Sequence, residues 1–168
     1  MCTLAVAWRI YDDTPVVVAA NRDEATDRPA TPPHVWPDAS DVRVLAPRDE
    51  AAGGTWTGVT DTGFYVGLTN RWSDLDPGRS RGCLVVGALR AGDPESARTL
   101  VEREVATHDY AGFNLVLASA ERAYLLQWDG DLRADALDPG VTVVTTTGTP
   151  SVSCRRSALA VGSSGRRR

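Results

Sequence analysis

The chain begins with two short apolar runs separated by a polar turn, a pattern that predicts a β-hairpin. Thr3–Trp8 and Pro15–Ala20 are the predicted strands, and the polar residues 11–14 form the turn between them. Residues 16–20 are apolar at every position rather than at alternate positions. A continuously apolar strand indicates that both faces of its sheet are buried, as in stacked sheets covered by helices.

Further apolar runs predict more antiparallel strands and two helices. The expected strands are Trp56–Thr60, Phe64–Asn70, Phe113–Ser119, Ala123–Trp128 and Val141–Thr145. Cys83–Ala91 is predicted to form a short apolar helix. A second helix is expected after Asp93, which caps it, with Pro94 in its first position and His108 at its end. Neither His108 nor His34, which we expect in a proline-rich loop, is a candidate for catalysis.

Cys2 directly follows the initiator methionine and is the first candidate for chemistry. Aminopeptidases remove Met1 when the next side chain is small, so we expect a mature chain that begins at Cys2. Such a residue carries a nucleophilic thiol beside a free α-amine, whose ordinary pKa of about 8 suits a base. The competing interpretation is structural, because a small buried cysteine also suits an apolar strand.

The first predicted hairpin brings the polar segment Asn21-Arg22-Asp23 back toward Cys2. Asp23 would orient the α-amine, Arg22 would stabilise the thiolate or bind a substrate carboxylate, and Asn21 would donate to a developing oxyanion. The alternative is a solvated turn, in which Asn and Asp bond to their own backbone. The spacing from Cys2 favours the catalytic interpretation.

Seven short motifs occur in order along the chain, and together they resemble the NRDE family, to which the eukaryotic transport and Golgi organisation proteins belong. They lie at residues 1–3, 19–24, 28–29, 53–58, 67–70, 80–82 and 112–115. The resemblance covers residues 1–145 and implies an α+β fold similar to that of the N-terminal nucleophile (Ntn) hydrolases, an αββα sandwich with antiparallel sheets. More distantly, the start of the chain is similar to choloylglycine hydrolases and penicillin V acylases, whose Asn-x-Asp matches Asn21 and Asp23.

Residues beyond the first hairpin add further candidates. By the distant resemblance, Asn70 would help to build the oxyanion hole, although an Asn at a strand end also caps loops. Gly54 would let backbone amides approach a substrate and Trp56 would line its pocket, but both residues also suit purely structural roles. Thr146 stands where family members commonly have an oxyanion-hole Asn, and loss of such a donor costs about 10²–10³ in turnover. In the distant amidases an Arg at the position of Ala20 orients the substrate. Because this chain has Ala there, that contact is not expected in it.

Composition and charge argue against several classes of function. The 168 residues carry a net charge of −4 and contain no Lys, and nothing before residue 150 resembles a basic groove for nucleic acid. No apolar stretch approaches the ~18–20 residues needed to span a membrane, and the start lacks a signal-peptide pattern. Cys2, Cys83 and Cys154 lack metal-ligand spacing. We therefore expect a cytoplasmic protein without a metal site, and its oligomeric state is left open.

Charge also marks a boundary near residue 150. Residues 1–150 form the predicted domain, whereas residues 151–168 contain five Arg and no acidic residue. This stretch is either a basic tail that contacts an anionic partner or the product of a reading-frame disruption, and we favour the second interpretation. Because family members usually continue further, the sandwich is expected to be incomplete at its C-terminal end.

Two functions follow from these expectations. The first is a cysteine amidohydrolase that cleaves a non-peptide amide C–N bond of a small-molecule substrate through Cys2, with no required cofactor. The second is a binding or trafficking protein on the same fold, because eukaryotic members of the family have been connected with haem movement and with lipid or acyl-CoA metabolism. In the second case Cys2 would ligate haem iron or act as a redox thiol.

Overall fold

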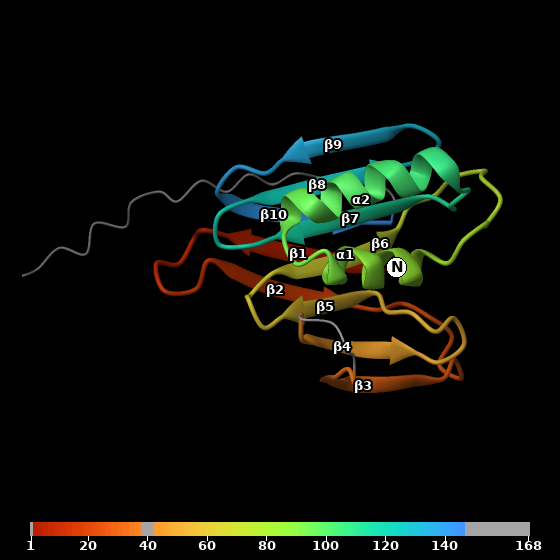
Figure 1. Ribbon diagram of the computed structural model, residues 1–168, viewed down its shortest axis with the longest axis horizontal. Coiled ribbons are helices and arrows are strands. Elements are labelled where there is room, and N and C mark those ends of the chain that lie inside the picture. The colour runs from red at the N-terminus through yellow and green to blue at the C-terminus, as the bar shows by residue number, and fades with distance from the viewer. Residues whose placement is uncertain (1, 38–41, 147–168) are drawn as a thin grey trace, which may run out of the picture.

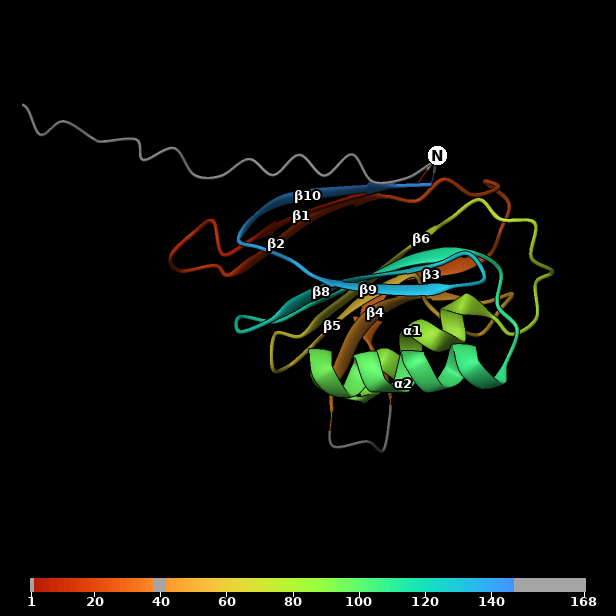
Figure 2. The same ribbon diagram turned by 90° about the horizontal axis from the view of Figure 1, so that it is seen from above.

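The computed structural model describes residues 2–37 and 42–146 of the chain. Its strands form two antiparallel sheets that stack face to face, and two helices cover the outer face of the larger sheet (Figures 1 and 2). The fold is therefore α+β with antiparallel sheets, as predicted. The described residues supply three of the four layers of an αββα sandwich, which agrees with an incomplete sandwich. The predicted tail at residues 151–168 lies outside the described residues.

The smaller sheet contains the N-terminal hairpin and has the strand order β10-β1-β2. Its strands are β1 (Thr3–Trp8), β2 (Val16–Asn21) and β10 (Gly140–Thr145). The predicted pairing of the first two strands is confirmed, and its register places Thr3 opposite Asn21. On its other side Thr3 lies opposite Thr145 of β10, so the start of the chain is held between two strand ends.

The larger sheet contains seven strands that lie side by side in chain order. They are β3 (Ala30–Val35), β4 (Val44–Asp49), β5 (Thr57–Thr60), β6 (Tyr65–Asn70), β7 (Phe113–Ala118), β8 (Ala123–Trp128) and β9 (Leu132–Ala136). The predicted hairpins β5–β6 and β7–β8 are confirmed, and Gly63 takes a φ of 80° in the first turn. The patterns did not predict β3, β4 and β9.

Helices α1 (Arg81–Arg90) and α2 (Pro94–Thr107) form the layer that covers the larger sheet. The predicted cap of α2 is present, because the Asp93 carboxylate accepts bonds from the backbone amides of Glu95 and Ser96 at 2.9 and 3.0 Å. Neither helix in the described part of the chain is long and apolar enough to cross a membrane.

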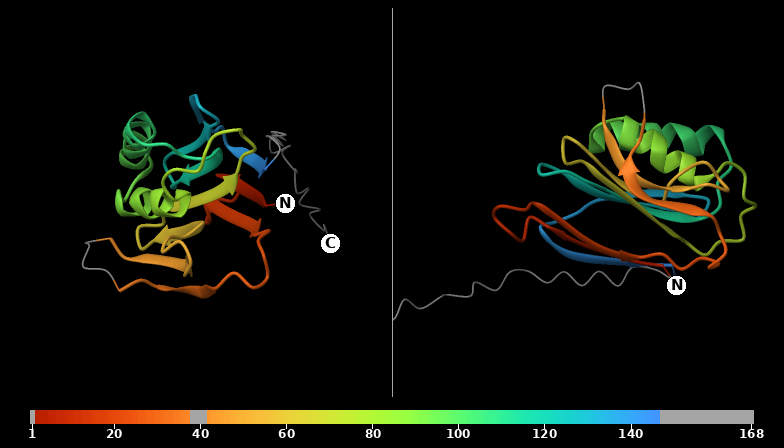
Figure 3. Two further views of the ribbon diagram at one scale, coloured as in Figure 1. Left: turned by 90° about the vertical axis from the view of Figure 1, so that its right-hand side faces the viewer. Right: turned by 90° about the horizontal axis from the view of Figure 1, so that it is seen from below.

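Burial follows the order of the layers. Every residue of β7 is buried, because this strand lies near the middle of the larger sheet with helices on one face and the smaller sheet on the other. The prediction that residues 16–20 are buried on both faces is wrong. β2 is an edge strand, and the outer face of its sheet carries no helix among the described residues (Figure 3), so Val17 remains 39% exposed.

The expectation that His34 lies in a loop is also wrong, because His34 belongs to β3. This strand tolerates Pro32 and Pro33 because it is the edge of the larger sheet and its register shifts between Thr31 and His34. His34 Nδ1 lies 2.9 Å from the Pro32 carbonyl oxygen, and its ring stacks near Trp36. Its surroundings are those of a surface strand.

Candidate active site

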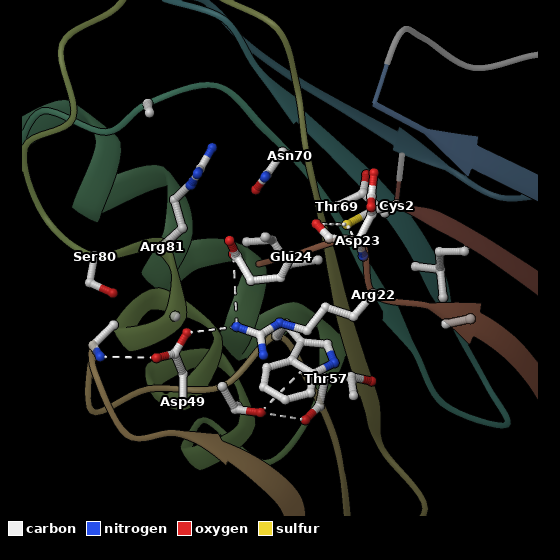
Figure 4. A pocket seen from close by; sticks show the side chains of 18 of the residues that line it. Cys2, Arg22, Asp23, Glu24, Asp49, Thr57, Thr69, Asn70, Ser80 and Arg81 are labelled. Atoms are coloured by element: carbon white, nitrogen blue, oxygen red, sulfur yellow. Dashed lines mark hydrogen bonds and ion pairs between the residues drawn. The ribbon is translucent and has the colours of Figure 1, made fainter. Parts of the chain in front are cut away.

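A cavity of about 350 Å³ opens where the start of β1, the end of β2, the end of β6 and the start of α1 meet. Its walls carry several charged and polar side chains, which Figure 4 shows at close range. The lining residues include Cys2, Arg22, Asp23, Glu24, Arg28, Asp49, Trp56, Tyr65, Asn70, Arg79 and Arg81. Six of the predicted site residues line this cavity: Cys2, Asn21, Arg22, Asp23, Trp56 and Asn70.

The hairpin register places Cys2 beside the segment that follows β2. Because Thr3 pairs with Asn21, the chain on either side of that pair continues with Cys2 and with Arg22-Asp23. The backbone amide of Asp23 donates to the Cys2 sulfur at 3.3 Å, and the thiol lies 3.7 Å from the Asp23 carbonyl oxygen. Cys2 itself is half-buried. The structure thus brings together the nucleophile candidate and the polar segment that the sequence pointed to.

Arg22 turns toward Asp49 rather than toward the sulfur (Figure 4). Its Nη2 lies 2.9 Å from Asp49 Oδ2, and its guanidinium stacks on the Trp56 ring at 3.9 Å from the ring centre. Arg28 Nε approaches the same Asp49 oxygen at 2.8 Å. Arg22 is therefore held in an ion-pair cluster, and the Trp56 ring, which is part of the cavity wall, packs against its guanidinium.

Asp49 anchors this cluster and is itself buried. Its other oxygen, Oδ1, accepts bonds from the backbone amides of Ala51 and Ala52 at 3.1 and 3.0 Å. Burial acts to raise the pKa of Asp49, but the bonds from Arg28 and Ala52 and the charges of Arg28 and Arg22 outweigh it. The net effect lowers the pKa, so Asp49 is the anion that organises this side of the cavity.

Asn70 lies at the exposed end of β6 and lines the cavity. Within residues 2–37 and 42–146, no hydrogen bond to its side chain is formed. Its backbone carbonyl oxygen lies 3.5 Å from Nδ2 of the buried Asn114. The same Nδ2 reaches Thr69 Oγ1 at 3.1 Å and the Thr145 carbonyl oxygen at 3.3 Å. Asn114 thereby joins the ends of β6 and β10 across the two sheets.

Arg81 is the first residue of α1 and extends along the cavity toward Asn70 in Figure 4. Its Nη1 donates to the Gly112 carbonyl oxygen at 2.6 Å. Burial lowers the pKa of Arg81, while the charges of Glu24 and Cys2 act in the opposite direction. Arg81 and Cys2 line the same cavity.

Gly54 and Thr146 are not among the described residues that line the cavity. Gly54 packs backbone to backbone against the start of α1, where an added Cβ would come within 2.4 Å of the Gly82 carbonyl carbon. Thr146 Oγ1 donates to the Cys2 carbonyl oxygen at 3.5 Å, and its own carbonyl accepts from the Trp72 amide at 3.4 Å. Both residues hold cavity-forming segments in place.

Three residues of the site were missed as candidates. Arg81 and Asn114 stand within motifs that carry the family resemblance, so the signal for them was present in the sequence. Asp49 had no such signal, because its strand β4 includes Pro47 and does not alternate regularly between buried and exposed positions. Among the described residues, no group of three or more His, Cys, Asp or Glu side chains could hold a metal ion.

The fold and cavity together define a class of protein: a two-sheet sandwich with a cysteine at the start of its first strand, on the wall of a polar cavity. The sequence model of the family described as Transport and Golgi organisation 2 matches residues 1–155, and the chain belongs to this family. The predicted membership in the NRDE family is thereby confirmed.

Relatives from mammals agree with this assignment. The Transport and Golgi organization protein 2 homolog of Bos taurus is 35% identical over 124 residues, which cover 69% of this chain and 44% of the bovine protein. The Homo sapiens homolog is 34% identical over 111 residues, covering 64% of this chain and 40% of the human protein. The chain therefore spans less than half the length of the curated relatives that it matches.

Proposed function

We propose that this chain is a cysteine amidohydrolase that cleaves a non-peptide amide C–N bond with Cys2 as the nucleophile. The observation that carries the proposal is the bond of 3.3 Å from the Asp23 backbone amide to the Cys2 sulfur, on the wall of a substrate-sized cavity. A donor aimed at the sulfur stabilises the negative charge that a thiolate carries when it attacks.

The catalytic steps assign one task to each group. After removal of Met1, the Cys2 sulfur forms a bond to the substrate carbonyl carbon, and the thiol proton passes to the α-amine. The side-chain amide of Asn70 donates to the oxyanion, and Asp23 orients the α-amine. The α-amine then protonates the leaving nitrogen as the C–N bond breaks, and water hydrolyses the resulting thioester.

Replacement of Cys2 tests the proposal. Purified protein is screened against N-acylated small molecules by the appearance of free amine, and its mass is measured to establish that Met1 is absent. We expect Cys2→Ala to abolish the hydrolysis, while Cys83→Ser, at an exposed thiol on α1, retains it. Hydrolysis that survives Cys2→Ala, or a mature protein that retains Met1, would rule out the N-terminal nucleophile.

A second candidate function, a lipid or acyl-chain carrier, is supported by a second cavity of about 380 Å³ between the two sheets, which shares Tyr65 with the cavity at Cys2. Its lining is mostly apolar and includes Val16 and Val18 of β2, Val59 of β5 and Tyr65 of β6. Displacement of a fluorescent fatty acid tests this candidate. Val18→Asp should abolish the displacement, whereas binding that is unchanged in this variant counts against a carrier at this position.

Haem fits these cavities less well than an acyl chain. No described His or Cys lines the apolar cavity, and the cavity that contains Cys2 is lined by charged side chains that suit an apolar macrocycle poorly. A haem titration decides the matter directly. A Soret shift that disappears in Cys2→Ala would support ligation by Cys2, and the absence of any shift would reject it.

A further inference from the structure

We infer that Arg81 binds a carboxylate or another small oxyanion of the substrate, next to the bond that Cys2 attacks. This inference rests on the proposed function and adds a substrate class to it: small amides that carry an anionic group close to the scissile carbonyl. It differs from the sequence-based prediction, which gave the task of binding a substrate carboxylate to Arg22.

The other arginines that line the cavity are already paired. Arg22 and Arg28 share one oxygen of Asp49 at 2.9 and 2.8 Å. Arg79 Nη1 lies 2.7 Å from Glu104 Oε2, which is outside the cavity lining. Arg22 and Arg28 are thus paired with two carboxylates, Asp49 and the more distant Glu24, and Arg79 is paired with Glu104.

Arg81 differs from them in this respect. Among the described residues, no carboxylate lies within 4.0 Å of its guanidinium, and its bonding partner is the neutral carbonyl of Gly112. A guanidinium has five N–H donors in a planar fork, so donors are left for a bidentate contact with a carboxylate. The side chain is half-buried, and desolvation makes such a contact stronger than it would be in open water.

Glu24 is the carboxylate that could oppose this role, since it lies on the same cavity wall. Its Oε2 lies 3.9 Å from Arg22 Nη2 and 4.0 Å from Arg28 Nε, whereas among the described residues it forms no ion pair with Arg81 within 4.0 Å. Figure 4 shows Arg81 extending away from the Asp49 cluster and toward Asn70. An anion bound there would lie on the Asn70 side of the cavity, where the proposed oxyanion also forms.

Two alkylating reagents of nearly equal size test the inference. Iodoacetate carries a carboxylate and iodoacetamide is neutral, and both transfer a two-carbon group to a thiolate with loss of iodide. The second-order rates at Cys2 are measured by peptide mass spectrometry at low ionic strength. The rate with iodoacetate is divided by the rate with iodoacetamide, first at Cys2 and then for a neutral small thiol, N-acetylcysteine amide. The ratio at Cys2 divided by the ratio for the small thiol gives the quotient. This quotient cancels any change in the fraction of thiolate, because that fraction affects both reagents equally.

We expect the quotient at Cys2 to exceed one, and Arg81→Gln to lower it about three- to tenfold at low salt. Arg81→Lys keeps the charge and should retain most of the preference, which separates a charge effect from a loss of local structure. Arg79→Gln is the matched control, because Arg79 lines the same cavity but pairs with Glu104, and it should leave the quotient unchanged. Thermal unfolding of each variant shows whether it is folded.

The two levels of the proposal fail in different ways. If Cys2 reacts no faster than the small thiol with either reagent, the nucleophile proposal fails and the anion site fails with it. If Cys2 reacts rapidly but its quotient equals one, or is the same in Arg81→Gln, the anion site is overturned and the nucleophile stands. A quotient that falls equally in Arg81→Gln and Arg79→Gln also overturns it, because the preference would then come from the general charge of the cavity.

Discussion

The Arg22 guanidinium lies 2.9 Å from the buried carboxylate of Asp49, and this ion pair joins the segment after β2 to the end of β4. Arg28 completes the cluster from the same side as Arg22. The smaller sheet is therefore connected to the larger one at the cavity by charge as well as by apolar packing. Since Asp23 is the next residue after Arg22, the cluster also fixes the backbone amide that faces the Cys2 sulfur.

Replacement of Asp49 by Asn should destabilise the protein and disturb Cys2. It removes the carboxylate that Arg22 and Arg28 contact at 2.9 and 2.8 Å and leaves only the more distant Glu24. A hydrogen bond to a charged group contributes about 1.5–3 kcal/mol. We expect the free energy of unfolding in urea to fall by about 2 kcal/mol or more. Glu50→Gln is the control at the adjacent exposed position, with an expected change within about 0.5 kcal/mol. Equal effects of the two substitutions would contradict the anchoring role.

Lowering the pH should also remove the contribution of Asp49 to the free energy of unfolding. The pKa of Asp49 is lowered in the folded protein, so its contribution to stability is complete above the ordinary Asp pKa and is lost as the pH falls through the lowered value. We expect the difference in unfolding free energy between the parent chain and Asp49→Asn to be constant near pH 6–7 and to shrink below about pH 4. A difference that stays constant down to pH 3 would show that the charge of Asp49 is not what stabilises the fold.

Gly54, which packs against the start of α1, and Gly87, which lies within α1, should respond oppositely to replacement by Ala. In Gly54→Ala the new Cβ would meet the Gly82 backbone at 2.4 Å, and overpacking of this kind costs about 1–3 kcal/mol. In Gly87→Ala, within α1, the nearest atoms belong to Leu100 at 3.5 Å, which is ordinary contact, and Ala is the better helix former by about 1 kcal/mol. Thermal unfolding should therefore move down for the first and up for the second. A neutral Gly54→Ala would show that the loop does not pack on α1 as described.

The sequence predicted those parts of the site that depend on local spacing. Strands β1 and β2 are consecutive in the chain and pair as a hairpin, and this pairing brings Asp23 to Cys2. The orientation of the Arg22 side chain, which points toward Asp49, could not be predicted in the same way. It depends on Asp49, which belongs to a strand whose apolar pattern is interrupted by Pro47.

Which strands are buried on both faces also could not be predicted from the local sequence pattern. Residues of β2 and β7 are similarly apolar, yet β7 is buried on both faces and β2 is largely exposed. The difference comes from position in the sheets, because β2 is an edge strand with an uncovered face while β7 has a neighbour on each side. Strand order in a sheet depends on long-range pairing, such as that of β1 with β10, and hydrophobic periodicity does not encode it.

Tyr65 should make the fold sensitive to alkali. Burial raises its pKa to about 12, and the bond of 2.9 Å with Thr57 Oγ1 offsets only part of that rise. A raised pKa means that the unfolded chain ionises first, so stability is complete below pH 10 and declines between pH 10 and 12. Tyr65→Phe should reduce this decline, at a cost of about 1 kcal/mol at neutral pH for the lost hydrogen bond. Tyr11→Phe, at an exposed position, serves as the control in the same pH series.

Asn70 should matter for acyl transfer to Cys2 but not for its alkylation. Acylation by a p-nitrophenyl ester passes through a tetrahedral oxyanion, whereas displacement of iodide from iodoacetamide does not form one. If the Asn70 amide donates to that oxyanion, Asn70→Ala releases nitrophenol about 10²-fold more slowly than the parent chain does. Its alkylation rate is unchanged.

The same pair of reactions distinguishes a lost oxyanion donor from a damaged thiol or a closed cavity. A loss of thiolate or of access to the cavity would slow acylation and alkylation together. Asn21→Ala is the comparison variant, because Asn21 lines the same cavity and was the other predicted oxyanion donor. Selective slowing of acylation in Asn21→Ala, with Asn70→Ala unaffected, would assign the oxyanion to the end of β2 instead of the end of β6.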